Sequence, residues 1–415
     1  MRKRWKTKLR SLWRVAGPGF ITGASDDDPS GIATYTQAGA AFGYQALWTA
    51  WITFPLMVSI QEMCARIGLV QQKGLTAVIK AHYPRWLLSL LVGLSFPAIA
   101  LNIGANLAAM GAVGNLLFPA IHPNLVSLLL LLILLYCLIR FPYRRIAAVL
   151  KWLCLVLLVY LLVPFYTRPD ILSVLKHTLV PTITLDAPFL AILVAILGTT
   201  ISPYLFFWQA NMEQEEACRR HLVVDRNIIT HMRRDIRIGM FYSNLIMFFI
   251  MLTAGSVLHM NGLTSIATVE DAAKALHPLA GRQAALLFSV GIIGTGMLAI
   301  PVLAGSVSYM VAETFSWREG LNRKFHRAKG FYYTMILSVL IGFTINFLGI
   351  PPVKALLITA IIYGLLAPVL IGIILHICNN PAVMGNYVNG KKANFWGGLC
   401  LVLMTAAAAG FLWLL

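Results

Sequence analysis

Charged residues are scarce in this sequence. Asp, Glu, Lys and Arg make up 12% of the 415 residues, against about a quarter in a typical soluble domain. Hydrophobic residues make up 59%. This balance excludes an ordinary soluble fold and indicates that lipid surrounds much of the chain.

Cysteine and histidine are also few, and their placement excludes two more classes of site. The six cysteines show neither zinc-site spacing nor the pattern of a disulfide framework. The nine histidines fall in or near the polar gaps between apolar runs, which argues against a zinc-type site inside the membrane.

Long apolar runs dominate instead, and several approach the roughly 20 residues that a helix needs to cross a bilayer. They predict an all-α membrane protein with about eleven transmembrane helices. The predicted spans are residues 15–43, 44–65, 87–117, 124–140, 146–166, 187–209, 238–258, 283–312, 331–349, 351–378 and 395–415.

The basic residues are distributed unevenly around these spans. If successive gaps face opposite sides of the membrane, 28 of the 33 Lys and Arg lie on the side of the N-terminus. This is the positive-inside pattern. We therefore expect a multi-pass protein of the cell (inner) membrane, with its basic N-terminal stretch 1–14 in the cytoplasm and its C-terminus outside. The alternation also disfavours the nucleic-acid partner that a net charge of +18 would otherwise suggest.

Two spans carry a proline beside small polar residues near their middle. Pro29 lies in the first span and Pro203 in the sixth. Because proline removes a backbone donor and clashes with the preceding turn, both helices are expected to break there. The two positions match in two successive sets of five spans, and an odd number of spans reverses the topology of the second set. The pattern predicts one transporter domain with inverted repeats at 1–166 and 187–378, followed by an extra helix at 395–415.

Three consecutive acids precede the first proline: Asp26, Asp27 and Asp28. A carboxylate near the bilayer centre costs a few kcal/mol, and no Lys or Arg lies at that depth as a partner. A cation, a water-filled cavity or protonation must compensate. Asp28 directly precedes the break and is the strongest candidate ligand, and unwinding could add Asp27. For Asp26 a hydrated cavity wall is as good an interpretation as a functional role.

Other polar residues near the breaks admit two interpretations each. Thr199 and Ser202 offer oxygens to a cation, or satisfy backbone groups freed by Pro203. Asn106 could orient water at the site or make an interhelical hydrogen bond. Gln209 closes the sixth predicted span, either as a solvated helix end or as a contact for passing ions.

The sequence around the two breaks resembles the NRAMP family of divalent metal transporters. Gly17-Pro18-Gly19-Phe20 and Asp28-Pro29-Ser30-Gly31 resemble that family's Gly-Pro-Gly and Asp-Pro-Gly-Asn signature, and residues 199–204 sit where it has Ala-x-x-Met-Pro-His. The resemblance covers nearly the whole chain. It implies a leucine-transporter-like fold of five plus five helices and one extra, with no cofactor beyond the transported ion. It also implies that metal is held by Asp28 and by backbone carbonyls near Ser25 and Thr199.

The sequence departs from this family at two metal-binding positions. The asparagine is replaced by Gly31, and the methionine by Ser202. Oxygen ligands suit Mg²⁺, Ca²⁺ or Mn²⁺ better than softer ions. Smaller residues should widen the site, and Mg²⁺ usually keeps several waters. The pattern resembles the NRAMP-related magnesium transporter branch and predicts transport of partly hydrated Mg²⁺ and/or Mn²⁺ by alternating access.

The residues that correspond to the family's proton pathway also differ. The histidine after the sixth-span proline is replaced by Tyr204, and the third-span acidic pair by Asn106 and Ala109. None of these side chains titrates near neutrality, so we expect weak or absent proton coupling.

Three alternatives remain open from sequence. One is a proton-coupled importer of Mn²⁺ or Fe²⁺, and another an organic-solute symporter of the same fold. The third is an intramembrane aspartyl protease, which needs two facing carboxylates that share a proton. Adjacent acids on one helix supply that geometry poorly, so we expect a transporter and not an enzyme.

Overall fold

The computed structural model describes residues 17–414, apart from residues 142, 144, 147, 148, 150, 151, 153 and 154. The basic stretch 1–14 and part of the predicted fifth span therefore lie outside the described residues. Within them the chain is helical and contains no strand.

Several helices match the predicted spans closely, and shorter ones connect them. The longer helices are α4 (Trp48–Gln71), α6 (Arg85–Leu117), α7 (Pro123–Arg140), α13 (Arg226–Val257), α16 (Ala284–Phe315), α17 (Lys329–Thr344), α18 (Pro352–Asn379) and α20 (Lys391–Trp413). The connecting helices are α5 (Leu75–His82), η1 (Leu155–Leu161), α9 (Val163–Thr167), α10 (Ile171–Leu179), η2 (His259–Asn261), α14 (Val269–Ala273), η3 (Lys274–Leu276), α15 (His277–Ala280), η4 (Gly281–Gln283), η5 (Phe325–Arg327), η6 (Ile345–Phe347), α19 (Pro381–Met384) and η7 (Gly385–Tyr387).

Both predicted helix breaks are present. The first span is divided into α2 (Pro18–Asp26) and α3 (Pro29–Phe42), and the sixth into α11 (Ala187–Thr200) and α12 (Pro203–Arg220). In each case proline occupies the first position of the second half, where its missing N–H costs nothing.

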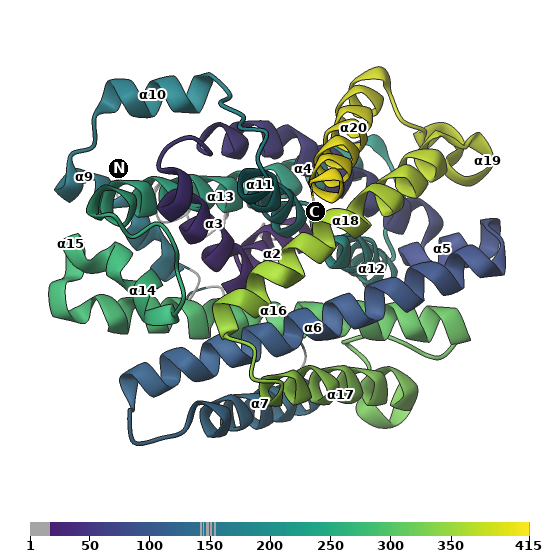
Figure 1. Ribbon diagram of the computed structural model, residues 1–415. Coiled ribbons are helices and arrows are strands. Elements are labelled where there is room, and N and C mark those ends of the chain that lie inside the picture. The colour runs from purple at the N-terminus through teal and green to yellow at the C-terminus, as the bar shows by residue number, and fades with distance from the viewer. Residues whose placement is uncertain are drawn as a thin grey trace, which may run out of the picture.

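The broken helices occupy the middle of the molecule. Figure 1 shows α2 and α3 enclosed by longer helices, with α6 crossing in front of α16 and α7 beside α17 at one edge. α13 packs against both α2 and α3, and α11 packs against α18. A Cβ added at Gly23 would lie 2.3 Å from the backbone of Gly239, so α2 and α13 touch through glycine. The first break is therefore held between other helices.

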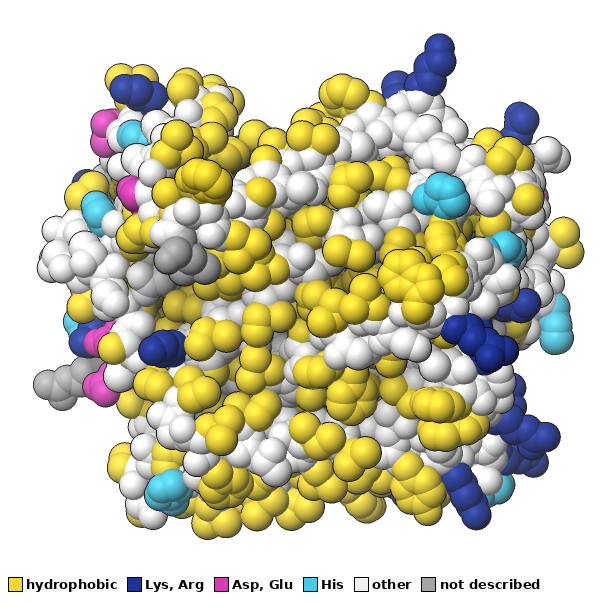
Figure 2. Space-filling view, turned by 45° about the vertical axis from the view of Figure 1, so that its right-hand side comes forward, with side chains coloured by type: hydrophobic (Ala, Val, Ile, Leu, Met, Phe, Trp, Pro, Cys, Tyr) yellow, Lys and Arg dark blue, Asp and Glu magenta, His cyan; other side chains and the backbone are white. Residues whose placement is uncertain are grey.

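Eight segments of the described chain are long and apolar enough to cross a membrane, and residues 155–167 form a shorter apolar one. The total of eleven spans stays a prediction. Figure 2 shows a largely hydrophobic face whose Lys and Arg side chains gather mainly along one edge. This arrangement is typical of a protein surrounded by lipid, with basic residues at the polar boundary.

The structure differs from the predicted spans between the sixth and seventh. The sixth predicted span ends at Gln209, and the seventh begins at residue 238. Instead α12 continues to Arg220 and α13 begins at Arg226. Asp225 caps α13 by accepting a hydrogen bond from the Ile228 amide at 2.7 Å. Polar sequence extends both helices beyond their apolar parts.

Candidate functional site

Asp28 lies at the first break with its carboxylate fixed from two directions. Its Oδ1 accepts a hydrogen bond from the Gly31 amide at 2.8 Å, which caps α3. Its Oδ2 accepts bonds from the amides of Asn106 at 3.0 Å and Asn102 at 3.3 Å, both on α6. The side chain is 1% exposed. Asp28 is thus a buried and oriented carboxylate, as a ligand at this break should be.

Asp26 and Asp27 face a different helix. The Ser243 hydroxyl on α13 lies 2.8 Å from Oδ2 of Asp26 and 3.2 Å from Oδ1 of Asp27. One hydroxyl carries one proton, so it can donate to only one of them at a time. The other oxygens, Oδ1 of Asp26 and Oδ2 of Asp27, are buried without a hydrogen-bond partner among the described residues. These two carboxylates retain coordination capacity.

At the second break, side-chain hydroxyls bond to the freed backbone. The Ser202 hydroxyl lies 2.6 Å from the Thr199 carbonyl and 3.0 Å from the Gly198 carbonyl. Thr200 likewise donates to the Ile196 carbonyl. This arrangement matches the interpretation that hydroxyls satisfy backbone groups near Pro203. The Thr199 carbonyl keeps a second lone pair for another partner.

The two breaks lie next to each other. The Tyr204 hydroxyl of α12 donates to the Ser25 carbonyl of α2 at 3.4 Å. A Cβ added at Gly31 would lie 3.5 Å from Oγ1 of Thr199 and 3.3 Å from the Asp26 carbonyl. Residues from both halves of the chain thus converge around Gly31.

Further polar groups link Asp28 to α18. The Thr359 hydroxyl lies 3.3 Å from Oδ1 of Asn102, whose amide bonds to Asp28. Ser30 lies 3.5 Å from the same hydroxyl and 3.1 Å from the Leu356 carbonyl. The amide orientation of Asn102 follows from these contacts, because its oxygen and its nitrogen each have a partner.

Gln209 lies away from a solvated helix end. It is fully buried on α12, accepts a hydrogen bond from Thr22 of α2 and donates to Glu213 at 3.1 Å. Its contacts therefore join α12 to α2 at Thr22, one helical turn before Asp26.

The possible metal ligands at the two breaks are oxygen atoms of carboxylates, hydroxyls and backbone carbonyls. Among the residues placed by the structure, no three Asp, Glu, His or Cys side chains converge on one position that could hold a metal. The three consecutive aspartates are divided instead, with Asp28 towards α6 and the other two towards α13. An ion here would need backbone carbonyls or water to complete its coordination.

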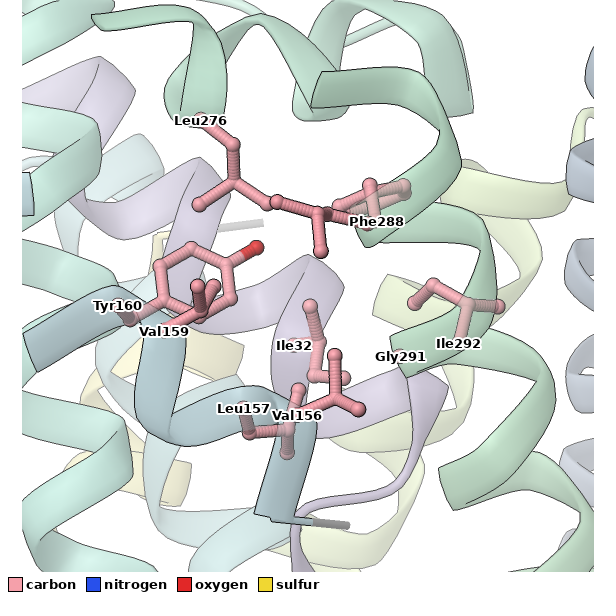
Figure 3. Close-up of a pocket in the computed structure, with 10 residues that line it drawn as sticks. Ile32, Val156, Leu157, Val159, Tyr160, Leu276, Phe288, Gly291 and Ile292 are labelled. Carbon is pink, nitrogen blue, oxygen red and sulfur yellow. The ribbon is translucent and has the colours of Figure 1, made fainter. Parts of the chain in front are cut away.

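A small cavity beside α3 is unsuited to a cation. Its volume is about 10 Å³, and it lies between Ile32, η1 and α16 (Figure 3). Its lining is apolar apart from the Tyr160 hydroxyl. Such a space holds one water at most, and it presents no charge to an ion.

Sequence reasoning missed three residues of this site: Asn102, Ser243 and Thr359. Each lies on a helix far from the breaks in sequence, and each is a buried polar residue in an apolar span. That last property was the available signal, because polar side chains within a membrane usually face the protein interior. It does not say which helix face meets which aspartate.

Comparison with known proteins identifies the family. A family model described as natural resistance-associated macrophage protein-like (Nramp) matches residues 19–414. The divalent metal cation transporter MntH of Klebsiella pneumoniae (strain 342) is 26% identical over 404 residues, which cover 94% of this chain and 92% of that protein.

Solved structures share the fold. A crystal structure of the Eremococcus coleocola manganese transporter has a TM-score of 0.77 at 21% identity, covering 96% of this chain and 86% of that one. Mhp1, a nucleobase-cation-symport-1 family transporter, has a TM-score of 0.59 at 12% identity, covering 96% and 92%. These matches confirm the all-α, leucine-transporter-like fold, and the family confirms a transporter rather than an enzyme. The chain belongs to the Nramp family and is a multi-pass membrane transporter of divalent metal cations.

Proposed function

We propose that this transporter carries Mg²⁺ and/or Mn²⁺ by alternating access, with the ion bound partly hydrated between the two helix breaks. The observation that carries the proposal is the oriented Asp28 carboxylate beside small residues at both breaks. Asp27 and the carbonyls of Ser25 and Thr199 complete the proposed ligand set. They are hard oxygen donors, which suit these two ions.

Ser202 and Gly31 act in this proposal mainly by their size. The Ser202 hydroxyl already bonds to the Thr199 carbonyl, so the second lone pair of that carbonyl, together with water, remains as a donor to the ion. Gly31 has no side chain, so it leaves space where the two breaks approach each other. A metal that retains water needs that room, and Mg²⁺ sheds its water reluctantly. Mn²⁺ fits the same ligands, and a manganese transporter is among the structural relatives.

Weak or absent proton coupling forms part of the proposal. Tyr204 donates its hydroxyl proton to the Ser25 carbonyl, and Asn106 donates to Asp28 as an amide. Neither side chain exchanges protons near neutral pH. The proton-coupled Mn²⁺ or Fe²⁺ importer is the competing function, and it would require the aspartates themselves to carry the proton.

We further propose that the protein lies in the inner membrane with its N-terminus in the cytoplasm and its C-terminus outside. The uneven distribution of Lys and Arg supports this orientation. The proposed repeats are 1–166 and 187–378, and each contributes one broken helix to the site.

Uptake of Mg²⁺, Mn²⁺, Fe²⁺ and Ca²⁺ into proteoliposomes tests the proposal. Wild-type protein should take up Mg²⁺ or Mn²⁺, and Asp28→Ala should reduce uptake to the level of empty liposomes. Asp186→Ala is the matched control, because Asp186 also caps a helix, α11, through the Phe189 amide but lies exposed at its start. Preference for Fe²⁺, or lumenal acidification that accompanies uptake, would favour the competing function.

A further inference from the structure

A second group of buried oxygens lies where α12 and α16 meet the start of α5. Glu313 near the end of α16 is 5% exposed, and its Oε2 accepts a hydrogen bond from the Ala77 amide at 3.1 Å. Asn211 on α12 is fully buried, and its Nδ2 donates to the Phe207 carbonyl at 3.0 Å. Among the described residues, Oε1 of Glu313 and Oδ1 of Asn211 have no hydrogen-bond partner.

Gly74 brings these two oxygens together. A Cβ added there would lie 1.8 Å from Oε1 of Glu313 and 2.2 Å from Oδ1 of Asn211. The two oxygens are therefore within about 4 Å of each other. While Glu313 is ionised, both oxygens accept hydrogen bonds and neither donates, so they cannot satisfy one another. Buried acceptors left in this way require a cation, a water molecule or a proton on Glu313 between them.

A third acceptor lies nearby in the loop after α16. Oε2 of Glu319 is also buried without a hydrogen-bond partner in the part of the chain that is described. Glu319 interacts electrostatically with Glu313 and Glu215, which repel its carboxylate, and with Arg323, which attracts it.

Lys80 does not neutralise this group. Nζ of Lys80 donates to the Thr314 carbonyl and to the Ser316 hydroxyl, both at 2.7 Å, and lies 3.3 Å from the Glu313 carbonyl. Its three protons are thus directed to the end of α16 rather than to a carboxylate.

We propose that Glu313, Asn211 and Glu319 form a second binding site for a partly hydrated divalent cation. Two carboxylates, one amide oxygen and water are hard donors of the kind that Mg²⁺ and Mn²⁺ bind. The site rests on the proposed function only for the identity of the ion. Asn211 lies nine residues beyond Ser202 on the same helix, or about 13 Å at about 1.5 Å per residue. The second site therefore lies along α12, between the central break and one side of the membrane.

Counting the Mn²⁺ ions bound to the purified full-length protein tests the second site. Wild type should bind two per chain, and Glu313→Gln should bind one. Gln keeps an oxygen to accept from Ala77, so the start of α5 stays capped. Asp225→Asn is the matched control, because it removes an exposed carboxylate that caps α13 and should leave both ions bound.

A gain of affinity separates ion binding from a merely structural role. Asn211→Asp adds a carboxylate where the amide oxygen now lies and should tighten Mn²⁺ binding at the second site by roughly tenfold, because affinity rises with ligand charge. Mg²⁺ should compete in both proteins. A misfolded protein would not bind more tightly, so this variant remains informative if Glu313→Gln is unstable.

The outcomes distinguish the two proposed sites. If Asp28→Ala binds one ion and Glu313→Gln also binds one, both sites stand. If only Glu313→Gln loses an ion, the central site is wrong and the second site stands. Unchanged Mn²⁺ number and affinity in both Glu313→Gln and Asn211→Asp would overturn the second site.

Discussion

Asn106 donates its amide proton to Asp28 across the space between α6 and the first helix break, at 3.0 Å. The amide oxygen of Asn106 is buried and has no hydrogen-bond partner among the residues that the structure describes. Asn106 therefore holds the carboxylate with one atom and leaves the other able to accept a hydrogen bond.

The first prediction concerns this amide. Asn106→Leu should raise the KM for Mn²⁺ by roughly 10- to 100-fold, the usual cost of losing a group that orients a metal ligand. Asn115→Leu on the same helix is the control, since its amide bonds to the Ile121 carbonyl at the end of α6. Equal KM values for the two variants in proteoliposome uptake would show that Asn106 has no role at the site.

The second prediction concerns Ser243. Ser243→Ala removes the donor that Asp26 and Asp27 share and should destabilise the protein by about 1–3 kcal/mol, the cost of leaving a buried acceptor without its donor. Ser308→Ala is the control, because among the described residues that buried hydroxyl bonds only to the Ala304 carbonyl of its own helix. The midpoint of thermal unfolding should be lower for Ser243→Ala, and Ser243→Thr should restore it. The idea is wrong if the two alanine variants unfold alike.

A third prediction addresses selectivity. Combining Gly31→Asn with Ser202→Met should shift preference from Mg²⁺ towards softer ions such as Fe²⁺, because a thioether sulfur and an added amide replace retained water. A side chain at position 31 would enter the space between the Asp26 carbonyl and Thr199. Competition of each metal against Mn²⁺ uptake measures the shift. An unchanged order of preference would contradict the proposed role of these positions.

The fourth prediction concerns the start of α2. Asp235 of α13 accepts hydrogen bonds from the amides of Gly17, Gly19 and Phe20 at 2.9, 2.7 and 3.3 Å. Asp235→Ala should loosen α2, because these amides have no acceptor within their own helix. Hydrogen exchange measured by mass spectrometry should become faster over residues 17–26.

The control for this variant is Asp170→Ala, which removes an exposed cap from α10. It should speed exchange in α10 and leave α2 unchanged. Equally slow exchange over α2 in the Asp235 variant and in wild type would show that helix packing alone holds it.

The helix breaks could be predicted because their local sequence determines them. Proline alone would not have been enough: Pro55, Pro97, Pro301 and Pro368 all lie within continuous helices. At each break, a neighbouring polar side chain bonds to a backbone group that has lost its helical partner. Asp28 accepts a hydrogen bond from the Gly31 amide, and Ser202 donates one to the Thr199 carbonyl. Short polar side chains beside proline were therefore the informative pattern.

The partners of the aspartates could not be predicted. Asp26 and Ser243 are 217 residues apart, and Asp28 and Asn106 are 78 apart. Periodicity places a residue on one face of its helix, but helix packing decides which other helix that face meets. For the same reason, the expectation that Asp27 joins Asp28 around one ion remains a proposal: the structure turns Asp27 towards Ser243.

Local sequence is enough to specify the membrane environment, the two broken helices and the row of acids at the first break, because hydropathy, proline and charge act locally along the chain. Helix packing is what orients Asp28 against α6 and lets Asp26 and Asp27 share a hydroxyl of α13. It alone brought Glu313 and Asn211 together beside Gly74. The reason is that a buried oxygen takes its partner from whichever helix packs against it, and that packing involves residues far apart in the chain.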